Sequence, residues 1–142
     1  MVETIWRQER LGIETQGRGL FNLTRELEGV VLRSGIVTGL CVVFVTHTSA
    51  SLVIQENADP AVLSDLERWL GELAPETRRW QHDEEGPDDM PAHARAAVTK
   101  TSETIPIAAG RLALGTWQAL YLWEHRTRPH RREIVVTLTG QA

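Results

Sequence analysis

Two apolar segments constrain the fold most, because both have the composition of strands from the interior of a β-sheet. The segment from Gly39 to His47 is almost unbroken in its apolar character and rich in β-branched residues, which is typical of a strand covered on both faces. Residues 117–123 are apolar on both alternating faces, which predicts a central strand. Both are far shorter than the ~20 residues of a membrane helix. We therefore expect no membrane association.

Shorter strand signals surround these two segments. They lie at residues 4–14, 51–55, 103–107 and 132–139, and three helix signals interrupt them. A chain of 142 residues is the size of one domain and can bury a real core. The order of signals predicts a single α+β domain over residues 1–142.

Capping residues predict where the three helices begin and end. Asn22 is a candidate N-cap for a helix that ends before Gly35. Asp59 followed by Pro60 is a second start signal, since proline is favoured at the first helical position. The buried stripe of this second helix should consist of Leu63, Leu66, Leu70 and Leu73. A third, alanine-rich helix is expected to begin at Pro91.

Composition narrows the class of function. The formal net charge of −4 opposes binding to a nucleic acid, which usually requires clustered excess Lys and Arg. The single cysteine, Cys41, lies within an apolar segment and cannot form an intramolecular disulfide. The first residues carry charges on both sides of a tryptophan and show no leader-like apolar stretch. We expect a cytoplasmic protein.

The first group of candidate site residues follows the apolar strand. His47, Thr48 and Ser49 stand at its end, and Glu56 and Asn57 follow a second short strand. Polar side chains at strand ends often face a ligand cleft. A turn followed by a helix cap explains the same residues equally well for His47 and Glu56.

The second group is a loop rich in carboxylates that has an imidazole at each end, His82 and His93. Such a loop could bind a metal, chelate a magnesium pyrophosphate or shuttle protons. The spacing matches no standard zinc motif, and a solvated acidic loop is an equal alternative. His93 is expected to face outward from the first turn of the third helix, where free amides attract anions.

The third group spans the second apolar segment. Gly115 and Thr116 precede it, and their amides and hydroxyl could cradle a phosphate oxygen. Glu124 and Arg126 lie two residues apart at its other end, where they could position a carboxylate and a phosphate clamp together. A surface ion pair is the alternative.

These three ordered groups resemble the signature blocks of the YjbQ family, small bacterial and archaeal proteins described as secondary thiamine-phosphate synthase enzymes. The residues that carry the resemblance lie in His47–Pro60, His82–His93 and Gly115–Arg126, and the resemblance runs over nearly the whole chain, from the first strand to Gly140. It implies a curved, mostly antiparallel β-sheet or sandwich flanked by about three helices. It also implies a homotrimer whose sites lie near subunit contacts.

The implied activity joins a pyrimidine pyrophosphate to a thiazole phosphate and releases pyrophosphate. The alternatives are a metal-dependent hydrolase of a phosphorylated metabolite and a non-catalytic binder of one. Mg²⁺ could accompany the pyrophosphate, Zn²⁺ could bind at the histidines, and no organic cofactor is expected. The predicted catalytic residues are His47, His82, His93, Glu124 and Arg126. The predicted metal ligands are His47, His82, His93 and Asp89. The predicted substrate-binding residues are Thr48, Ser49, Glu56, Asn57, Glu85, Gly115, Thr116, Trp117 and Gln118.

Overall fold

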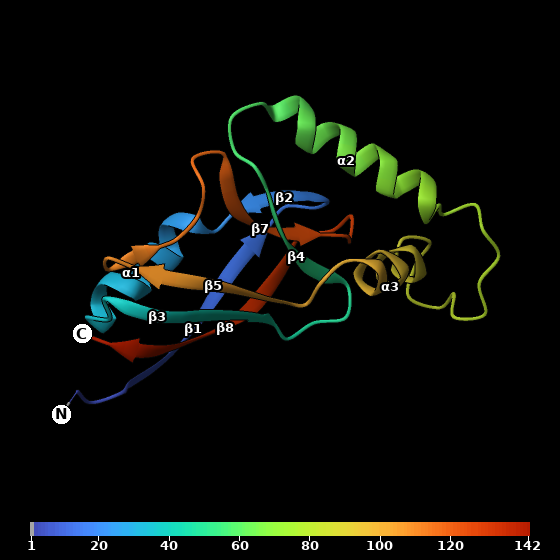
Figure 1. Cartoon of the computed structure of the whole chain (residues 1–142). Coiled ribbons are helices and arrows are strands. Elements are labelled where there is room, and N and C mark those ends of the chain that lie inside the picture. The colour runs from blue at the N-terminus through green and yellow to red at the C-terminus, as the bar shows by residue number, and fades with distance from the viewer. Residues whose placement is uncertain (1) are drawn as a thin grey trace.

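The computed structural model describes residues 2–142 and folds them into two antiparallel sheets with three helices (Figure 1). The larger sheet has the strand order β1 (Ile5–Thr15), β8 (His130–Gln141), β3 (Thr38–Val45), β5 (Ser102–Ala108) and β6 (Arg111–Leu112). The smaller sheet has the order β2 (Gly19–Asn22), β7 (Gln118–Glu124) and β4 (Ala50–Glu56). The predicted α+β class with antiparallel strands and three helices is confirmed.

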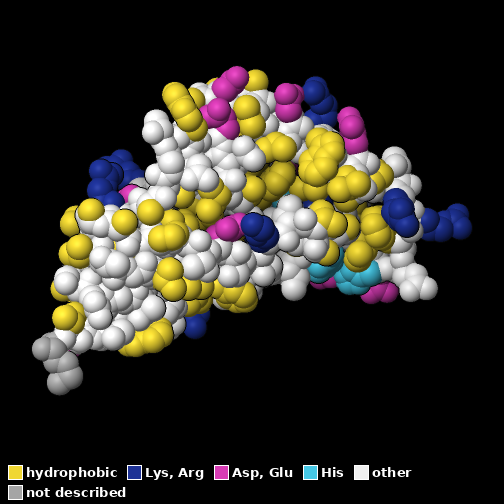
Figure 2. All heavy atoms as spheres, viewed as in Figure 1, with side chains coloured by type: hydrophobic (Ala, Val, Ile, Leu, Met, Phe, Trp, Pro, Cys, Tyr) yellow, Lys and Arg dark blue, Asp and Glu magenta, His cyan; other side chains and the backbone are white. Residues whose placement is uncertain are grey.

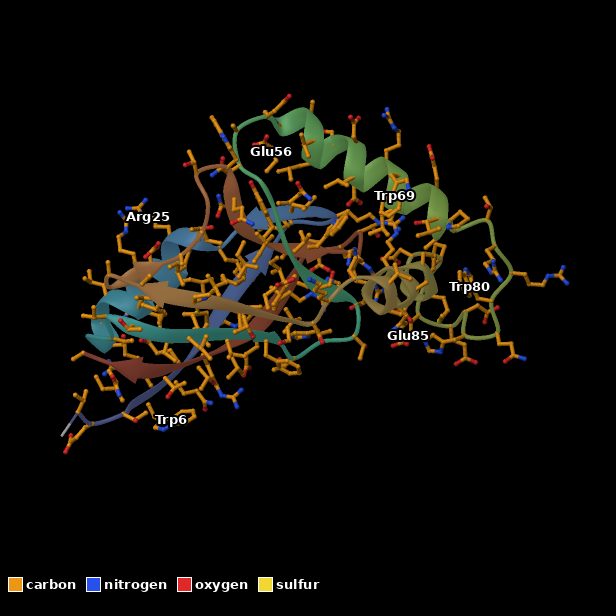
Figure 3. The ribbon with its side chains drawn as sticks, viewed as in Figure 1. Trp6, Arg25, Glu56, Trp69, Trp80 and Glu85 are labelled. Carbon is orange, nitrogen blue, oxygen red and sulfur yellow. The ribbon has the colours of Figure 1, made fainter. Side chains whose placement is uncertain are left out.

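The two apolar segments occupy the middle of their sheets, as predicted. β3 lies between β8 and β5, and β7 lies between β2 and β4. The expectation that β3 is covered on both faces was wrong, because Leu40 and Phe44 are 44% and 46% exposed while Val43 and Val45 are buried. The exposed face continues onto β1, where Trp6 stands in the same register row as Leu40 (Figure 3). One face of the larger sheet therefore remains open to solvent and partly apolar.

Helix α1 (Thr24–Ser34) packs its apolar side into the core between the sheets. Asn22 does not occupy the cap position but ends β2, and its side-chain oxygen accepts a hydrogen bond from the Thr24 N–H at 2.9 Å. The predicted end of the helix is confirmed, since Gly35 takes the left-handed conformation with φ of 73°.

Helix α2 (Pro60–Leu73) begins as predicted, with the Asp59 carboxylate accepting a hydrogen bond from the Ala61 N–H at 2.9 Å. Its predicted buried stripe is correct only in part. Leu70 is fully buried, whereas Leu73 is 57% exposed, because the helix crosses β4 and projects beyond the sheet (Figure 1).

Helix α3 (Asp89–Val98) begins two residues before the predicted start. His93 therefore lies in the second turn, and the free amides of the first turn belong to the residues before it. Residues 74–88 connect α2 to α3 as a loop at one end of the molecule (Figure 1). Among the described residues no helix is both long enough and apolar enough to cross a membrane.

Candidate functional site

A compact group of two imidazoles and one carboxylate lies where the 74–88 loop meets helix α3. The Asp89 Oδ2 atom is 2.8 Å from the Nε2 atom of His82 and 3.3 Å from that of His93. The ligand atoms of all three residues lie within 4.8 Å of one another. His93 reaches Asp89 because the two residues are four positions apart on one helix. The loop brings His82 to the same place.

Arg126 fixes the carboxylates of this group from the end of β7. Its guanidinium donates to Asp89 Oδ1 at 2.8 Å, to Asp88 Oδ2 at 2.9 Å and to the Glu85 carbonyl at 3.0 Å. Burial alone would raise the pKa of the Asp88 carboxyl, but hydrogen bonds from Arg126 and Thr127 hold it at about 2. Three of the five guanidinium N–H donors are thus used on oxygens of the chain itself, so Arg126 positions Asp89, and its predicted role as a phosphate clamp stays a prediction.

The donor set fits a divalent metal that accepts imidazole nitrogen. Zinc is held at about 2.0–2.2 Å by histidine and carboxylate ligands, so ligand atoms on one ion lie up to about 4 Å apart. The two His–Asp distances already fall in that range. Magnesium demands mostly oxygen ligands, whereas two of the three clustered ligands here are imidazoles. The oxygens nearby are those of Asp89, of Glu85, whose Oε2 is 2.8 Å from the His82 ring, and of Asp88, which Arg126 already binds. The geometry favours zinc over magnesium at this point.

The surroundings of His82 also favour a bound cation. Hydrogen bonds to Asp89 and then to Glu85 raise the pKa of the His82 imidazole. These carboxylates stabilise positive charge on the ring, and a metal would supply the same charge while displacing the proton. Figure 2 shows histidine and acidic side chains side by side at the surface of this end of the molecule.

His47 lies outside this group. Its Nε2 accepts a hydrogen bond from the Glu133 N–H at 2.9 Å, and its Nδ1 is 3.4 Å from the Arg132 guanidinium. Burial, followed by the charge of Arg132, lowers the pKa of the ring. His47 and Thr48 nevertheless line a hollow of about 260 Å³ that His93 also lines. The structure therefore brings His82 and His93 together at Asp89. It separates His47 from them, on the wall of a hollow that His93 also lines.

Glu124, one of the predicted catalytic residues, forms a buried ion pair with Arg132. Both side chains are at most 4% exposed, and the guanidinium makes two hydrogen bonds to the carboxylate. The same guanidinium donates to the Ser49 hydroxyl at 3.0 Å. Hydrogen bonds from Arg132 and Thr15 overcome the opposing effect of burial and lower the pKa of Glu124. The pair holds Ser49 in place directly before β4.

The remaining predicted residues lie at the opposite end of the smaller sheet. β4 and β7 run antiparallel, so Glu56 pairs with Gln118 at one end while Ala50 pairs with Glu124 at the other. Six residues of strand separate these ends by about 20 Å. Figure 3 shows Glu56 and Glu85 in correspondingly distant parts of the molecule.

The turn from Gly115 to Gln118 uses its own amides. Gly115 N–H donates to the Gln118 side chain at 2.8 Å, and Gln118 N–H donates to the Gly115 carbonyl at 3.0 Å. Asn57 donates to the Thr116 carbonyl at 3.0 Å and tethers the turn to β4. Of the groups predicted to cradle a phosphate, the Gly115 amide is therefore already bonded within the turn, while Trp117 remains 64% exposed.

His125 is a buried imidazole that was assigned no role from the sequence. It is fully buried, and its Nε2 lies 2.8 Å from the Ser51 hydroxyl. Burial, assisted by the nearby charge of Arg95, lowers its pKa to about 3. Because Ser51 is also fully buried, this pair serves the packing of the sheet rather than a nucleophilic reaction.

The family model described as "UPF0047 protein YjbQ-like" matches residues 9–141. The chain belongs to the YjbQ family. Among YjbQ relatives, the UPF0047 protein sll1880 of Synechocystis is 60% identical over 135 residues, covering 94% of this chain and 92% of its own. The UPF0047 protein YjbQ of Salmonella typhimurium is 39% identical and covers 96% of this chain and 100% of its own.

Solved structures of YjbQ-like proteins have the same fold. A YbjQ-like protein from Sulfolobus solfataricus superposes with a TM-score of 0.85 at 27% identity, covering 95% of this chain and 99% of that one. A YjbQ/UPF0047 family protein from Clostridium acetobutylicum gives a TM-score of 0.85 at 32% identity, covering 92% and 98%. The resemblance read from the three sequence blocks is thus confirmed at the level of the family and its fold.

Proposed function

We propose that this chain is a metal-dependent enzyme that joins a pyrimidine pyrophosphate to a thiazole phosphate and releases pyrophosphate. One observation carries the proposal: His82, Asp89 and His93 place three metal-ligand atoms within 4.8 Å of one another at the protein surface. Hollows adjoin this group on two sides, one lined by His82 and the other by His93. Two hollows beside one charged centre suit a reaction of two substrates.

The coupling reaction requires that the thiazole nitrogen be positioned against the carbon it attacks and that the negative charge on the leaving pyrophosphate be neutralised. The carbon–oxygen bond to pyrophosphate breaks as the thiazole nitrogen forms a new bond to that carbon, and the pyrophosphate leaves with both electrons. A cation bound at the imidazoles would stabilise the charge that develops on the leaving oxygen. Arg126 holds Asp89 in position by a hydrogen bond, so this carboxylate is already oriented before substrates bind.

A hydrolase of a phosphorylated metabolite is the second candidate. The observation in its favour is that the group supplies three protein ligands, and catalytic zinc sites combine three protein ligands with a fourth position open to water. A metal held there would supply Lewis-acid activation of a water molecule; in the hydrolysis the water oxygen would bond to phosphorus, the bond from phosphorus to the metabolite's oxygen would break, and phosphate and the free alcohol would leave.

The assay that tests these functions uses purified protein loaded with Zn²⁺ or with Mg²⁺. With both substrates present we expect pyrophosphate and the coupled product, and we expect His82→Ala and His93→Ala each to lower turnover at least about 100-fold. His130→Ala is the matched control, because its imidazole contacts only the Arg128 carbonyl. Pyrophosphate or phosphate released from one substrate alone would favour the hydrolase. Substrate binding without any turnover would leave a non-catalytic binder.

The homotrimer implied by the resemblance forms part of the same proposal. In one chain, Glu56, Asn57 and the Gly115 turn are about 20 Å from Glu124. A ring of copies joins two different surfaces at each contact, whereas a two-fold dimer joins like to like. A ring can therefore bring the Gly115 end of one copy to the His82 end of the next. The open sheet face with Trp6, Leu40 and Phe44 offers apolar surface for such contacts.

Sedimentation velocity tests the assembly. We expect the purified chain to sediment as a trimer, and Phe44→Asp to shift it toward smaller species because a charge would be buried in the contact. Glu3→Lys, an exposed change near the N-terminus, is the control. A wild-type chain that sediments as a monomer at assay concentration would contradict the trimer.

A further inference from the structure

A second feature of the 74–88 loop is a cation-lined hollow that adjoins the metal-ligand group. Its volume is about 390 Å³, and Arg78, Arg79, Trp80 and His82 line it together with Glu76, Asp83, Gly86, Pro87 and Met90. A second hollow of about 380 Å³ shares the two arginines, Trp80 and His82. His82 thus forms a wall of the hollow while its Nε2 atom points to Asp89. A ligand in this space can touch the metal group and the arginines at once.

Besides the carboxylates of Glu76 and Asp83, the wall of this hollow contains donors for which the described residues supply no acceptor. Throughout residues 2–142, no carboxylate lies within ion-pair distance of Arg78 or Arg79. The Trp80 indole N–H is buried and has no hydrogen-bond partner in the same part of the chain. Buried donors are normally satisfied by protein, water or ligand, so this N–H can donate to a partner from outside the chain.

The local charge balance favours an anion. Of the two acids in the wall, Glu76 is already paired with Arg18 at 3.0 Å. The guanidinium of Arg78 lies over the Trp80 ring, 5.3 Å from its centroid, which restrains that side chain by a cation–π contact. A planar arginine guanidinium can donate two parallel hydrogen bonds to two oxygens of one phosphate. Figure 2 shows Lys and Arg side chains at the same end of the molecule as the exposed histidines.

We propose that this hollow binds the terminal phosphate of a diphosphate ester, whose inner phosphate lies at the His82–Asp89–His93 group. The inference rests on the proposed function and narrows it, because it assigns the diphosphate substrate to the His82 side and leaves the His47 side for the second substrate. Two adjacent binding points select a diphosphate over a monophosphate. Arg78 and Arg79 hold the outer phosphate, and the Trp80 N–H donates one further hydrogen bond.

Calorimetric titration with inorganic pyrophosphate and with inorganic phosphate tests the assignment on zinc-loaded protein. We expect pyrophosphate to bind more tightly than phosphate. Each of Arg78→Gln and Arg79→Gln should weaken pyrophosphate binding about tenfold, and the double variant should abolish the preference. Zinc stoichiometry should not change in any of them. Arg68→Gln, which removes an exposed guanidinium paired with Asp65 on α2, is the matched control.

The outcomes separate the two proposals. Arginine-dependent pyrophosphate binding in a protein that catalyses neither reaction would retain the phosphate site and reject the enzyme. Wild-type pyrophosphate affinity in the double arginine variant would reject the phosphate site whatever the catalytic result. A Trp80→Phe variant supplies an independent readout, since the fluorescence change on adding pyrophosphate should be lost with this indole. If that change persists undiminished, the ligand binds elsewhere and the assignment is wrong.

Discussion

Replacing Arg132 with Met is expected to lower the free energy of unfolding by about 3–5 kcal/mol, because the Glu124 carboxylate would remain buried without its counter-charge. Glu124 is fully buried and accepts two hydrogen bonds from this guanidinium. The Thr15 hydroxyl and the Arg126 N–H would still donate to it, but neither carries a compensating charge there. Urea unfolding followed by far-UV circular dichroism measures the change.

The neighbouring residue supplies the control. Arg131, also on β8, pairs with Glu14 on β1, but these side chains are 70% and 64% exposed, so Arg131→Met should cost less than about 1 kcal/mol. The double variant Glu124→Leu with Arg132→Met should recover most of the lost stability, since paired buried charges can often be replaced by apolar side chains. A loss below about 1 kcal/mol for Arg132→Met would show that water reaches the pair and that Glu124 does not depend on it.

Sequence patterns were sufficient for the central strands and for the boundaries set by backbone chemistry. The β-branched and aromatic content of residues 39–45 and 118–123 reflects burial in the middle of a sheet, which local composition records. Gly35 marks the end of α1 because glycine adopts the left-handed conformation without steric cost, and Pro60 marks the start of α2 because its fixed φ suits the first helical position. Strand composition and helix-boundary residues depend only on neighbours a few positions away, so they can be recognised in a single sequence.

The assembly of the site depends on distant pairings that a single sequence does not record. The candidate groups were treated as one centre, but the antiparallel register of β4 and β7 separates Glu56 from Glu124. Pairing register follows from tertiary packing and turn geometry. His82 meets His93 only because the 15-residue loop between α2 and α3 follows a particular path. The number of residues between the two histidines does not determine that path.

Arg132 was passed over although the sequence contained a signal for it. Along β8 the side chains of Arg132, Ile134, Val136 and Leu138 alternate with more exposed residues, and all four are buried. A period-two pattern that begins with arginine places a charge on the core-facing side of a strand. Such a charge needs a buried acid, and Glu124 at the end of an apolar strand was the available partner.

Replacing Asp89 with Asn is expected to weaken zinc binding at least about 100-fold, and turnover should fall in proportion to zinc occupancy. Substitution of residues that only support metal ligands typically costs 10–100-fold in affinity, and this change removes the negative charge from a ligand itself. Asp89 is the carboxylate on which both imidazoles converge. Zinc affinity is measured by competition with a chelator of known strength, and unfolding curves establish that the variant is folded.

Three further variants sharpen the interpretation. Arg126→Gln should lower zinc affinity by about 10–100-fold, because it removes the donor that orients Asp89 without removing a ligand. His47→Ala should leave zinc affinity near that of the wild type, since its ring nitrogens face Glu133 and Arg132. Asp83→Asn, an exposed change in the same loop, controls for the loss of general negative charge. Equal zinc affinity in wild type and Asp89→Asn would mean that the three side chains are joined by hydrogen bonds alone, and the metal-dependent mechanism would have to be abandoned.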